Sequence, residues 1–119
     1  MRKKLYGVSF DSNRKYQYAT VPAGASAVVY VYPIPWGFTG FIDQVANSWY
    51  PNTYLLWFAP TLVEKVQRVI GQIDAPKHYD PPIVAESEIR WVAYNNDIVD
   101  HVFQILCDGV LYQQIPVVP

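Results

Sequence analysis

Apolar residues along the chain gather in short stretches, alternating or continuous, that turn residues separate. Stretches of this kind, rich in Val, Ile, Tyr and Trp, are typical of β-strands. The stretches expected to form strands are residues 16–21, 27–32, 38–49, 53–58, 89–94, 99–107 and 110–115. Prolines and glycines separate several of them, as in residues 33–37, because these residues do not fit a central strand. Three prolines likewise predict a loop over residues 74–82.

Residues 60–71 fit two interpretations. Helical spacing of apolar residues, Pro60 at a first helical position and Gly71 after the last one favour a short helix. The apolar residues at that spacing are Leu62, Val63, Val66, Val69 and Ile70. Several β-branched residues and the lack of a capping residue favour a strand that follows a turn at Ala59-Pro60. We favour the strand, because its neighbours are strands, and leave the helix open.

These elements predict an all-β fold for a chain of 119 residues, which fits one domain. Asp108-Gly109 is a strong hairpin signal and would join the last two strands. Eight or nine short strands with regular turns indicate an antiparallel β-sandwich, jelly-roll-like domain or small barrel. We expect a basic N-terminal arm over residues 1–14, the sandwich over 15–115 and an extended tail over 116–119.

Composition points towards contacts between subunits. Aromatic residues make up 16% of the chain and charged residues only 16%, against about 25% charged residues in average proteins. Protein interfaces are rich in Tyr and Trp and poor in Lys and Glu. The sequence therefore favours a homo-oligomer, with a trimer as one form, while an ordinary monomeric β domain remains the alternative.

Charge is distributed unevenly along the chain. Residues 1–15 carry a net charge of +4, and residues 16–119 carry −5. The basic residues expected to bind a partner are Arg2, Lys3, Lys4, Arg14 and Lys15. We expect this arm to dock on acidic surface of the same or a neighbouring chain. Five cations without a repeat, beside an acidic body, weigh against nucleic acid as the partner.

The sequence contains no recognisable catalytic motif, so we expect a protein that is not an enzyme and needs no cofactor. His78 and His101 have no second ligand at a spacing typical of zinc sites, and no metal is expected. The single cysteine, Cys107, lies in an apolar run and is interpreted as a core residue. Asn95, Asn96, Asp97 and Asp100 cluster at one turn and offer oxygen ligands that suit Ca²⁺, but such side chains ordinarily bond their own backbone.

Aromatic residues in loops are the remaining candidates for binding. Trp36, Trp49 and Tyr50 lie beside prolines and are expected to bind a ligand or partner, or to cover the end of the core. Trp57 and Trp91 lie inside strands and are expected in the core.

No apolar stretch reaches the 18 residues that a membrane-spanning helix needs, so no membrane is expected. The basic start resembles a signal peptide, but the polar residues 11–15 interrupt any apolar region. We therefore expect synthesis in the cytoplasm without a secretion signal.

Three features between Ala19 and Tyr112 resemble the small β-sandwich virion proteins of tailed bacteriophages. They are the segment 20–24 before the first long strand, two similar hairpins, and the late Asp108-Gly109 signal. The resemblance implies a non-enzymatic virion protein that decorates or stabilises a capsid and contacts other capsid or tail proteins. The alternative is a sugar-binding or adhesin module, for instance of a phage fibre, that uses the loop aromatics. The resemblance concerns architecture, and no functional residue is transferred by it.

Overall fold

The computed structural model describes residues 3–9, 17–72 and 74–116. These residues form nine strands and no helix. The strands are β1 (Lys3–Ser9), β2 (Gln17–Val21), β3 (Ser26–Pro33), β4 (Phe38–Asn47), β5 (Thr53–Phe58), β6 (Leu62–Val66), β7 (Lys77–Ala85), β8 (Glu88–Asn95) and β9 (His101–Pro116). The all-β class and the sandwich architecture expected from the sequence are confirmed.

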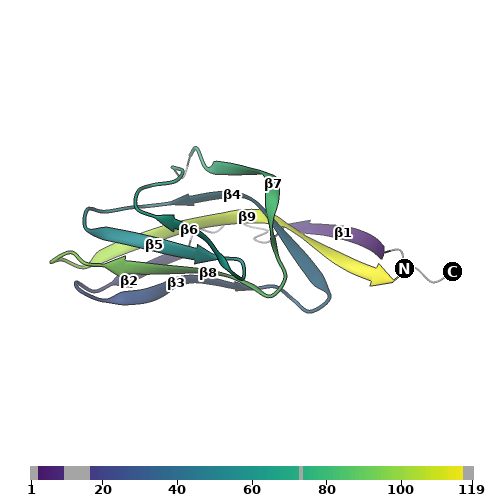
Figure 1. Ribbon diagram of the computed structural model, residues 1–119, viewed down its shortest axis with the longest axis horizontal. Coiled ribbons are helices and arrows are strands. Elements are labelled where there is room, and N and C mark those ends of the chain that lie inside the picture. Colours follow the sequence, from purple (N-terminus) through teal and green to yellow (C-terminus); the bar gives the residue numbers. More distant parts are fainter. Residues whose placement is uncertain (1–2, 10–16, 73, 117–119) are drawn as a thin grey trace.

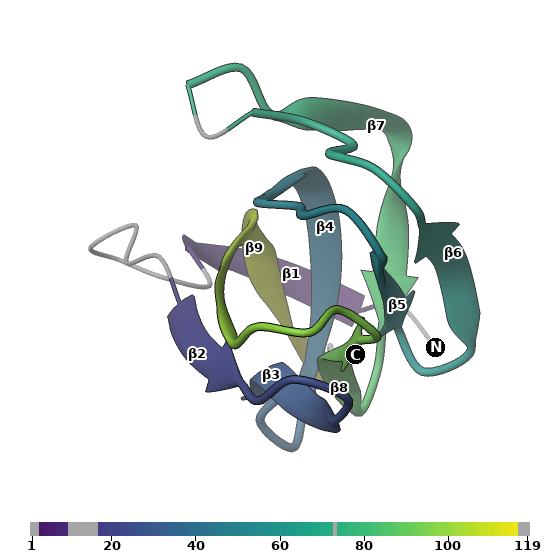
Figure 2. The same ribbon diagram turned by 90° about the vertical axis from the view of Figure 1, so that its left-hand side faces the viewer.

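The strands form two antiparallel sheets that face each other (Figures 1 and 2). One sheet has the order β3-β8-β5-β6. The other has the order β1-β9-β4-β7, and β2 also pairs with β9. Both β1 and β2 lie along one edge of β9, β2 opposite residues 101–105 and β1 opposite residues 110–116. Strand β4 follows β3 and precedes β5, so the two connections lie at its opposite ends.

The core lies between the two sheets and is centred on two tryptophans. Trp57 of β5 and Trp91 of β8 are directly paired, fully buried, and stacked with ring centroids 5.5 Å apart. Phe103 and Ile105 of β9 and Val45 of β4 approach from the opposite sheet. Burial alternates along β5 and β8, so each strand has one buried face and one outer face. The core positions expected for the two tryptophans are confirmed.

The hairpin expected at Asp108-Gly109 is wrong, because β9 continues through both residues. Gly109 faces Ile42 across the ladder, and a Cβ atom there would collide with the carbonyl oxygen of Phe41. The buried Asp108 carboxylate accepts hydrogen bonds from Gln44 Nε2 and from the Gly109 amide, both 2.8 Å long. The glycine allows two strands to approach closely beside a β-bulge, and no turn is formed.

Two further expectations concern residues 60–71 and residues 74–82. Residues 60–71 contain no helix, because Leu62–Val66 pairs with β5 as β6 after the turn at Ala59-Pro60. The loop expected over residues 74–82 is largely wrong, because Lys77–Ala85 forms β7. Strand β7 lies at the edge of its sheet, where Pro81 and Pro82 remove few ladder hydrogen bonds.

The N-terminal arm also departs from the expectation. Lys3–Ser9 is strand β1 and pairs with residues 110–116 of β9, so this part of the expected arm belongs to the sheet. Strand β1 and the end of β9 extend beyond the strands of the β3-β8-β5-β6 sheet (Figure 1). The expected tail at 116–119 starts with the last residue of β9, and its other three residues lie outside the described ranges.

Candidate binding surface

The outer face of the β3-β8-β5-β6 sheet is largely apolar. Cross-strand pairing forms one row from Val28, Val92 and Leu56, and a second row from Val31, Arg90 and Phe58. Val28 and Val31 are each 47% exposed, and Leu62 on the adjacent strand β6 is 53% exposed. In a sandwich, the outer face of a sheet normally carries polar residues. An open apolar face of this kind is typical of a surface that contacts another molecule.

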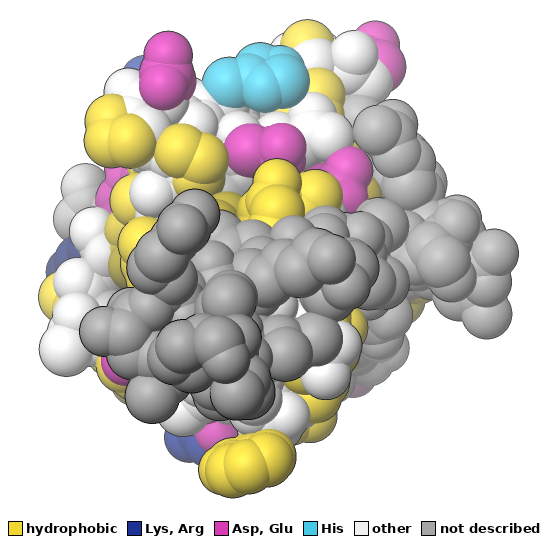
Figure 3. Space-filling view, turned by 90° about the vertical axis from the view of Figure 1, so that its right-hand side faces the viewer, with side chains coloured by type: hydrophobic (Ala, Val, Ile, Leu, Met, Phe, Trp, Pro, Cys, Tyr) yellow, Lys and Arg dark blue, Asp and Glu magenta, His cyan; other side chains and the backbone are white. Residues whose placement is uncertain are grey.

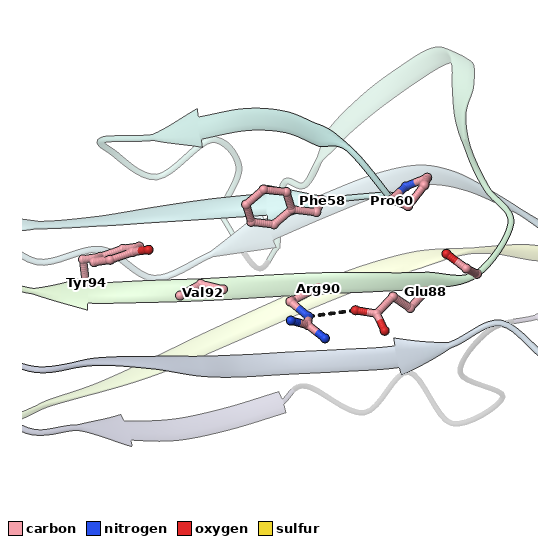
Figure 4. A pocket seen from close by; sticks show the side chains of 7 residues that line it. Phe58, Pro60, Glu88, Arg90, Val92 and Tyr94 are labelled. Carbon is pink, nitrogen blue, oxygen red and sulfur yellow. Dashed lines mark ion pairs between the residues drawn. The ribbon is translucent and has the colours of Figure 1, made fainter.

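A trough of about 440 Å³ lies on this face, over β8 and the end of β5 (Figure 4). The residues that line it are Phe58, Pro60, Ser87, Glu88, Arg90, Val92 and Tyr94. Arg90 Nε and Glu88 Oε2 form an ion pair of 2.7 Å within the lining. The trough thus has aromatic and aliphatic walls and one charged pair whose net charge is zero, and its volume lies in the range of ligand sites.

A stacked aromatic pair extends this surface along the sheet. The rings of Tyr54 and Tyr94 lie parallel with centroids 4.6 Å apart. Lys65 Nζ of β6 lies 4.5 Å from the Tyr54 ring centroid, in cation–π geometry. The Tyr94 ring, which lines the trough, is therefore held in position by its stack on Tyr54 of the adjacent strand.

Trp36 lies in the connection between β3 and β4, and its side chain is 99% exposed. The turn that carries it is well fixed, because the Phe38 amide donates to the Pro35 carbonyl over 3.0 Å and Gly37 has a φ of 86°. This hydrogen bond and positive φ match a type II turn, which needs glycine at its third position. The turn is anchored by the buried Ile34, whose amide donates to the Ser87 carbonyl over 2.8 Å. Because Ser87 also lines the trough, the Trp36 turn and the trough are neighbours.

Trp49 and Tyr50 lie at the opposite end of β4 and make contacts within the protein. Trp49 Nε1 donates to the Thr53 carbonyl over 2.9 Å, and the Tyr50 hydroxyl donates to the Val102 carbonyl over 2.7 Å. The Tyr50 ring stacks on His101 with centroids 4.0 Å apart. The three aromatic residues considered together from the sequence therefore do not form one site. Only Trp36 presents a ring without partners among the described residues.

Side-chain hydrogen bonds hold the loop between β8 and β9, which lies at the same end of the molecule as Trp49 and Tyr50. Asn95 is fully buried, and its Nδ2 donates to the carbonyls of Val21 and Val99, both over 2.9 Å. His101 Nε2 lies 2.8 Å from Asp97 Oδ2, and this hydrogen bond is the main reason why the pKa of Asp97 lies below its usual value. Asn95 and Asp97 also accept hydrogen bonds from nearby backbone amides, as turn side chains do.

Two titratable side chains elsewhere in the described residues, Cys107 and Tyr79, have raised pKa values. Burial raises the pKa of the Cys107 thiol well above its usual range, so the thiol stays protonated. Burial and the Glu64 carboxylate likewise raise the pKa of Tyr79, whose hydroxyl donates to Glu64 over 3.0 Å. In the part of the chain that the structure describes, no group of three His, Cys, Asp or Glu side chains could hold a metal ion.

The basic residues expected to bind a partner are mostly beyond the described structure. Arg2, Arg14 and Lys15 lie outside the described residues, and Lys3 and Lys4 belong to the backbone ladder of β1. Figure 3 shows the end of the molecule from which β1 and β9 project, and the coloured part of this view has several acidic side chains and few basic ones. The docking of the arm on acidic surface stays a prediction.

The trough residues were not identified from the sequence. The alternation of Ile89–Tyr94 indicated that Arg90, Val92 and Tyr94 share one face of a strand. It did not indicate which strand lies beside them, and that pairing with β5 brings Phe58 into the same trough.

Comparisons with protein-family models, with curated proteins and with solved structures find no match to this chain. A helix able to span a membrane is not found among residues 3–9, 17–72 and 74–116.

Proposed function

We propose that the protein is a non-enzymatic structural protein of a bacteriophage particle, which decorates or stabilises the capsid through contacts between subunits. The observation that carries the proposal is the open apolar face of the β3-β8-β5-β6 sheet, where Val28, Val31 and Leu62 are about half exposed. Burying such a face against another subunit is favourable, by about 25 cal/mol for each Å² of apolar surface removed from water.

The low content of charged residues supports the same proposal, because fewer charges must be desolvated when subunits meet. The fully exposed Trp36 adds an anchor of the kind that dominates protein interfaces. The partners would be other copies of this chain and other capsid or tail proteins.

Particle association tests this function directly. In the organism that expresses the chain, the protein should sediment with assembled particles in a density gradient and should be found there by mass spectrometry. A high-salt wash should leave it bound, because apolar contacts are not screened by salt. The protein being abundant in the lysate but missing from purified particles would contradict the proposal.

Sugar binding is the second candidate function, and one observation favours it. The trough combines the aromatic ring of Phe58 with polar groups of Ser87 and Glu88, which is a composition that suits sugars. Such a module would use Trp36 without Trp49 and Tyr50, because these two residues lie at the other end of β4. A glycan array with the wild-type protein and Trp36→Ala tests this alternative, and the absence of any glycan signal would contradict it.

A further inference from the structure

We propose that two copies of the chain associate by exchanging Trp36, so that the indole of each copy enters the trough of the other. The inference rests on the proposed function, since it names the contact through which copies of the chain meet. It starts from an indole that is 99% exposed and from a trough that begins beside it, runs along β8 and is filled by nothing in the described structure.

The Trp36 turn is built to hold its side chain away from the domain. The Pro35–Phe38 hydrogen bond and the positive φ of Gly37 fix the turn, and the buried Ile34 fixes its base. An exposed tryptophan leaves an apolar surface of about 150–250 Å² in water. A rigid turn loses little conformational entropy on binding, so most of the gain from burying this surface is kept.

The trough suits a flat aromatic ring. Phe58 and Tyr94 supply aromatic walls, and Val92 lies between them on the sheet (Figure 4). Arg90 supplies a guanidinium group, which attracts the face of an indole, the best cation–π acceptor among the side chains. The volume of about 440 Å³ leaves room for an indole and for part of the turn that carries it.

Charge favours a second copy as the occupant. Arg90 and Glu88 already pair at 2.7 Å, so the trough has no net charge. Residues 33–37 contain no charged side chain. When two copies meet about a twofold axis, the same surface is used on both copies. A surface without net charge then avoids the repulsion between like charges that a charged surface would meet.

The positions of the two features allow the exchange to be reciprocal. Pro33 pairs with Glu88 across the β3–β8 ladder, and the Ile34 amide bonds to Ser87. The indole and the trough of one copy are therefore adjacent, and a twofold axis beside them brings each indole towards the trough of the partner. Such an interface closes after two copies.

Sedimentation equilibrium of the purified chain tests the proposal first. The wild-type protein should dimerise, and Trp36→Ala should weaken the dimer by at least about tenfold, because an interface tryptophan is a typical hot spot. Ile98→Ala is the matched control, since Ile98 is another highly exposed apolar side chain, in the β8–β9 loop at the opposite end. This control should leave the dissociation constant unchanged.

The second variant blocks the trough. Val92→Lys places a charge on the outer face where the indole would lie, and Val84→Lys is its control on the other sheet, at a valine that is 46% exposed. Circular dichroism shows whether both variants are folded. Only Val92→Lys should weaken the dimer.

Mixing the two weakened variants tests the exchange itself. Trp36→Ala retains a trough and Val92→Lys retains an indole, so the mixture should form a heterodimer through one remaining contact. Each variant alone should form less dimer than the mixture at the same total concentration.

Three results would overturn the proposal: a wild-type protein that stays monomeric at millimolar concentration, a dimer that Trp36→Ala leaves unchanged, and a mixture that associates no better than its components. A monomeric wild-type protein whose glycan binding depends on Trp36 would assign the trough to sugars instead. None of these results alters whether the protein sediments with particles, so failure of this contact is distinct from failure of the proposed function.

Discussion

The two ends of strand β4 carry tryptophans in similar sequence surroundings but in different structural situations. Trp36 follows a proline and Trp49 lies two residues before one. The Trp49 indole donates to the Thr53 carbonyl, and its neighbour Tyr50 stacks on His101. The Trp36 indole has no partner among the described residues and is 99% exposed, although its turn is fixed on both sides. A loop aromatic is therefore available for binding only where the surrounding backbone and side chains leave it without partners.

The end that contains Trp49 should therefore respond strongly to loss of its internal contacts. The largest effect is expected for Asn95→Ala, which removes three hydrogen bonds made by a fully buried side chain. Losing these bonds, of which the one to the Val21 carbonyl is buried, should lower the free energy of unfolding by about 3 kcal/mol. Urea denaturation measures this loss, and Asn96→Ala, an exposed position in the same loop, is the control. Equal stability of the two variants would contradict the role given to Asn95.

Tyr50 should show the next largest effect. Tyr50→Ala removes the stack on His101 and the edge contact with Phe103, whose ring centroid lies 5.5 Å away. We expect a loss of about 2 kcal/mol in the free energy of unfolding. Tyr50→Phe keeps both ring contacts and loses only the hydrogen bond to Val102, so its loss should be about 1 kcal/mol or less. A Tyr50→Ala variant as stable as the wild-type protein would show that this end does not depend on the ring.

The Asp97–His101 contact should make the free energy of unfolding depend on pH in the acidic range. The pKa of Asp97 is lowered in the folded protein from its usual 3.8, so the folded state binds this proton less readily than the unfolded state. The contribution of Asp97 is then present above about pH 4 and is lost as the pH falls through the folded pKa. Asp97→Asn should reduce this acid dependence, as followed by thermal unfolding between pH 2 and about pH 6. Identical pH profiles for the two proteins would rule out this linkage.

Trp36 should show the smallest effect on stability. Trp36→Ala removes a side chain that is 99% exposed, so the free energy of unfolding should change by less than about 0.5 kcal/mol. Chemical denaturation at a protein concentration where only monomer is present measures this value. A loss as large as that of Tyr50→Ala would mean that Trp36 belongs to the fold, and the contrast between the two ends would disappear.

Much of the fold could be predicted from the sequence because its signals are local. Strands β3 and β5 follow from continuous apolar stretches between turn residues, and β8 follows from alternation. The core positions of Trp57 and Trp91 follow from their places inside such strands. The continuity of β9 could not be predicted, because Gly109 is needed for the close approach of Phe41 on another strand. The prolines of β7 wrongly indicated a loop, because proline is tolerated in an edge strand and a sequence does not show which strand lies at an edge.

The candidate surface could be predicted only in part. Trp36 was a candidate from its type and its prolines, but so were Trp49 and Tyr50. What separates them is a set of tertiary partners, among them the Val102 carbonyl, which comes from the start of β9. The trough depends on strand pairing between β5 and β8, and its arginine carries no sequence signal that distinguishes it from other surface arginines.

The dissociation constant of the self-associated protein tests most directly whether the two ends differ in role. It should be measured by sedimentation equilibrium for the wild-type protein, Trp36→Ala and Trp49→Phe. Trp36→Ala should raise the constant by about tenfold or more, whereas Trp49→Phe should cost about 1 kcal/mol of stability and leave the constant unchanged. Unchanged association for Trp36→Ala, or equal weakening by both variants, would contradict the assignment of Trp36 to a partner and of Trp49 to the fold.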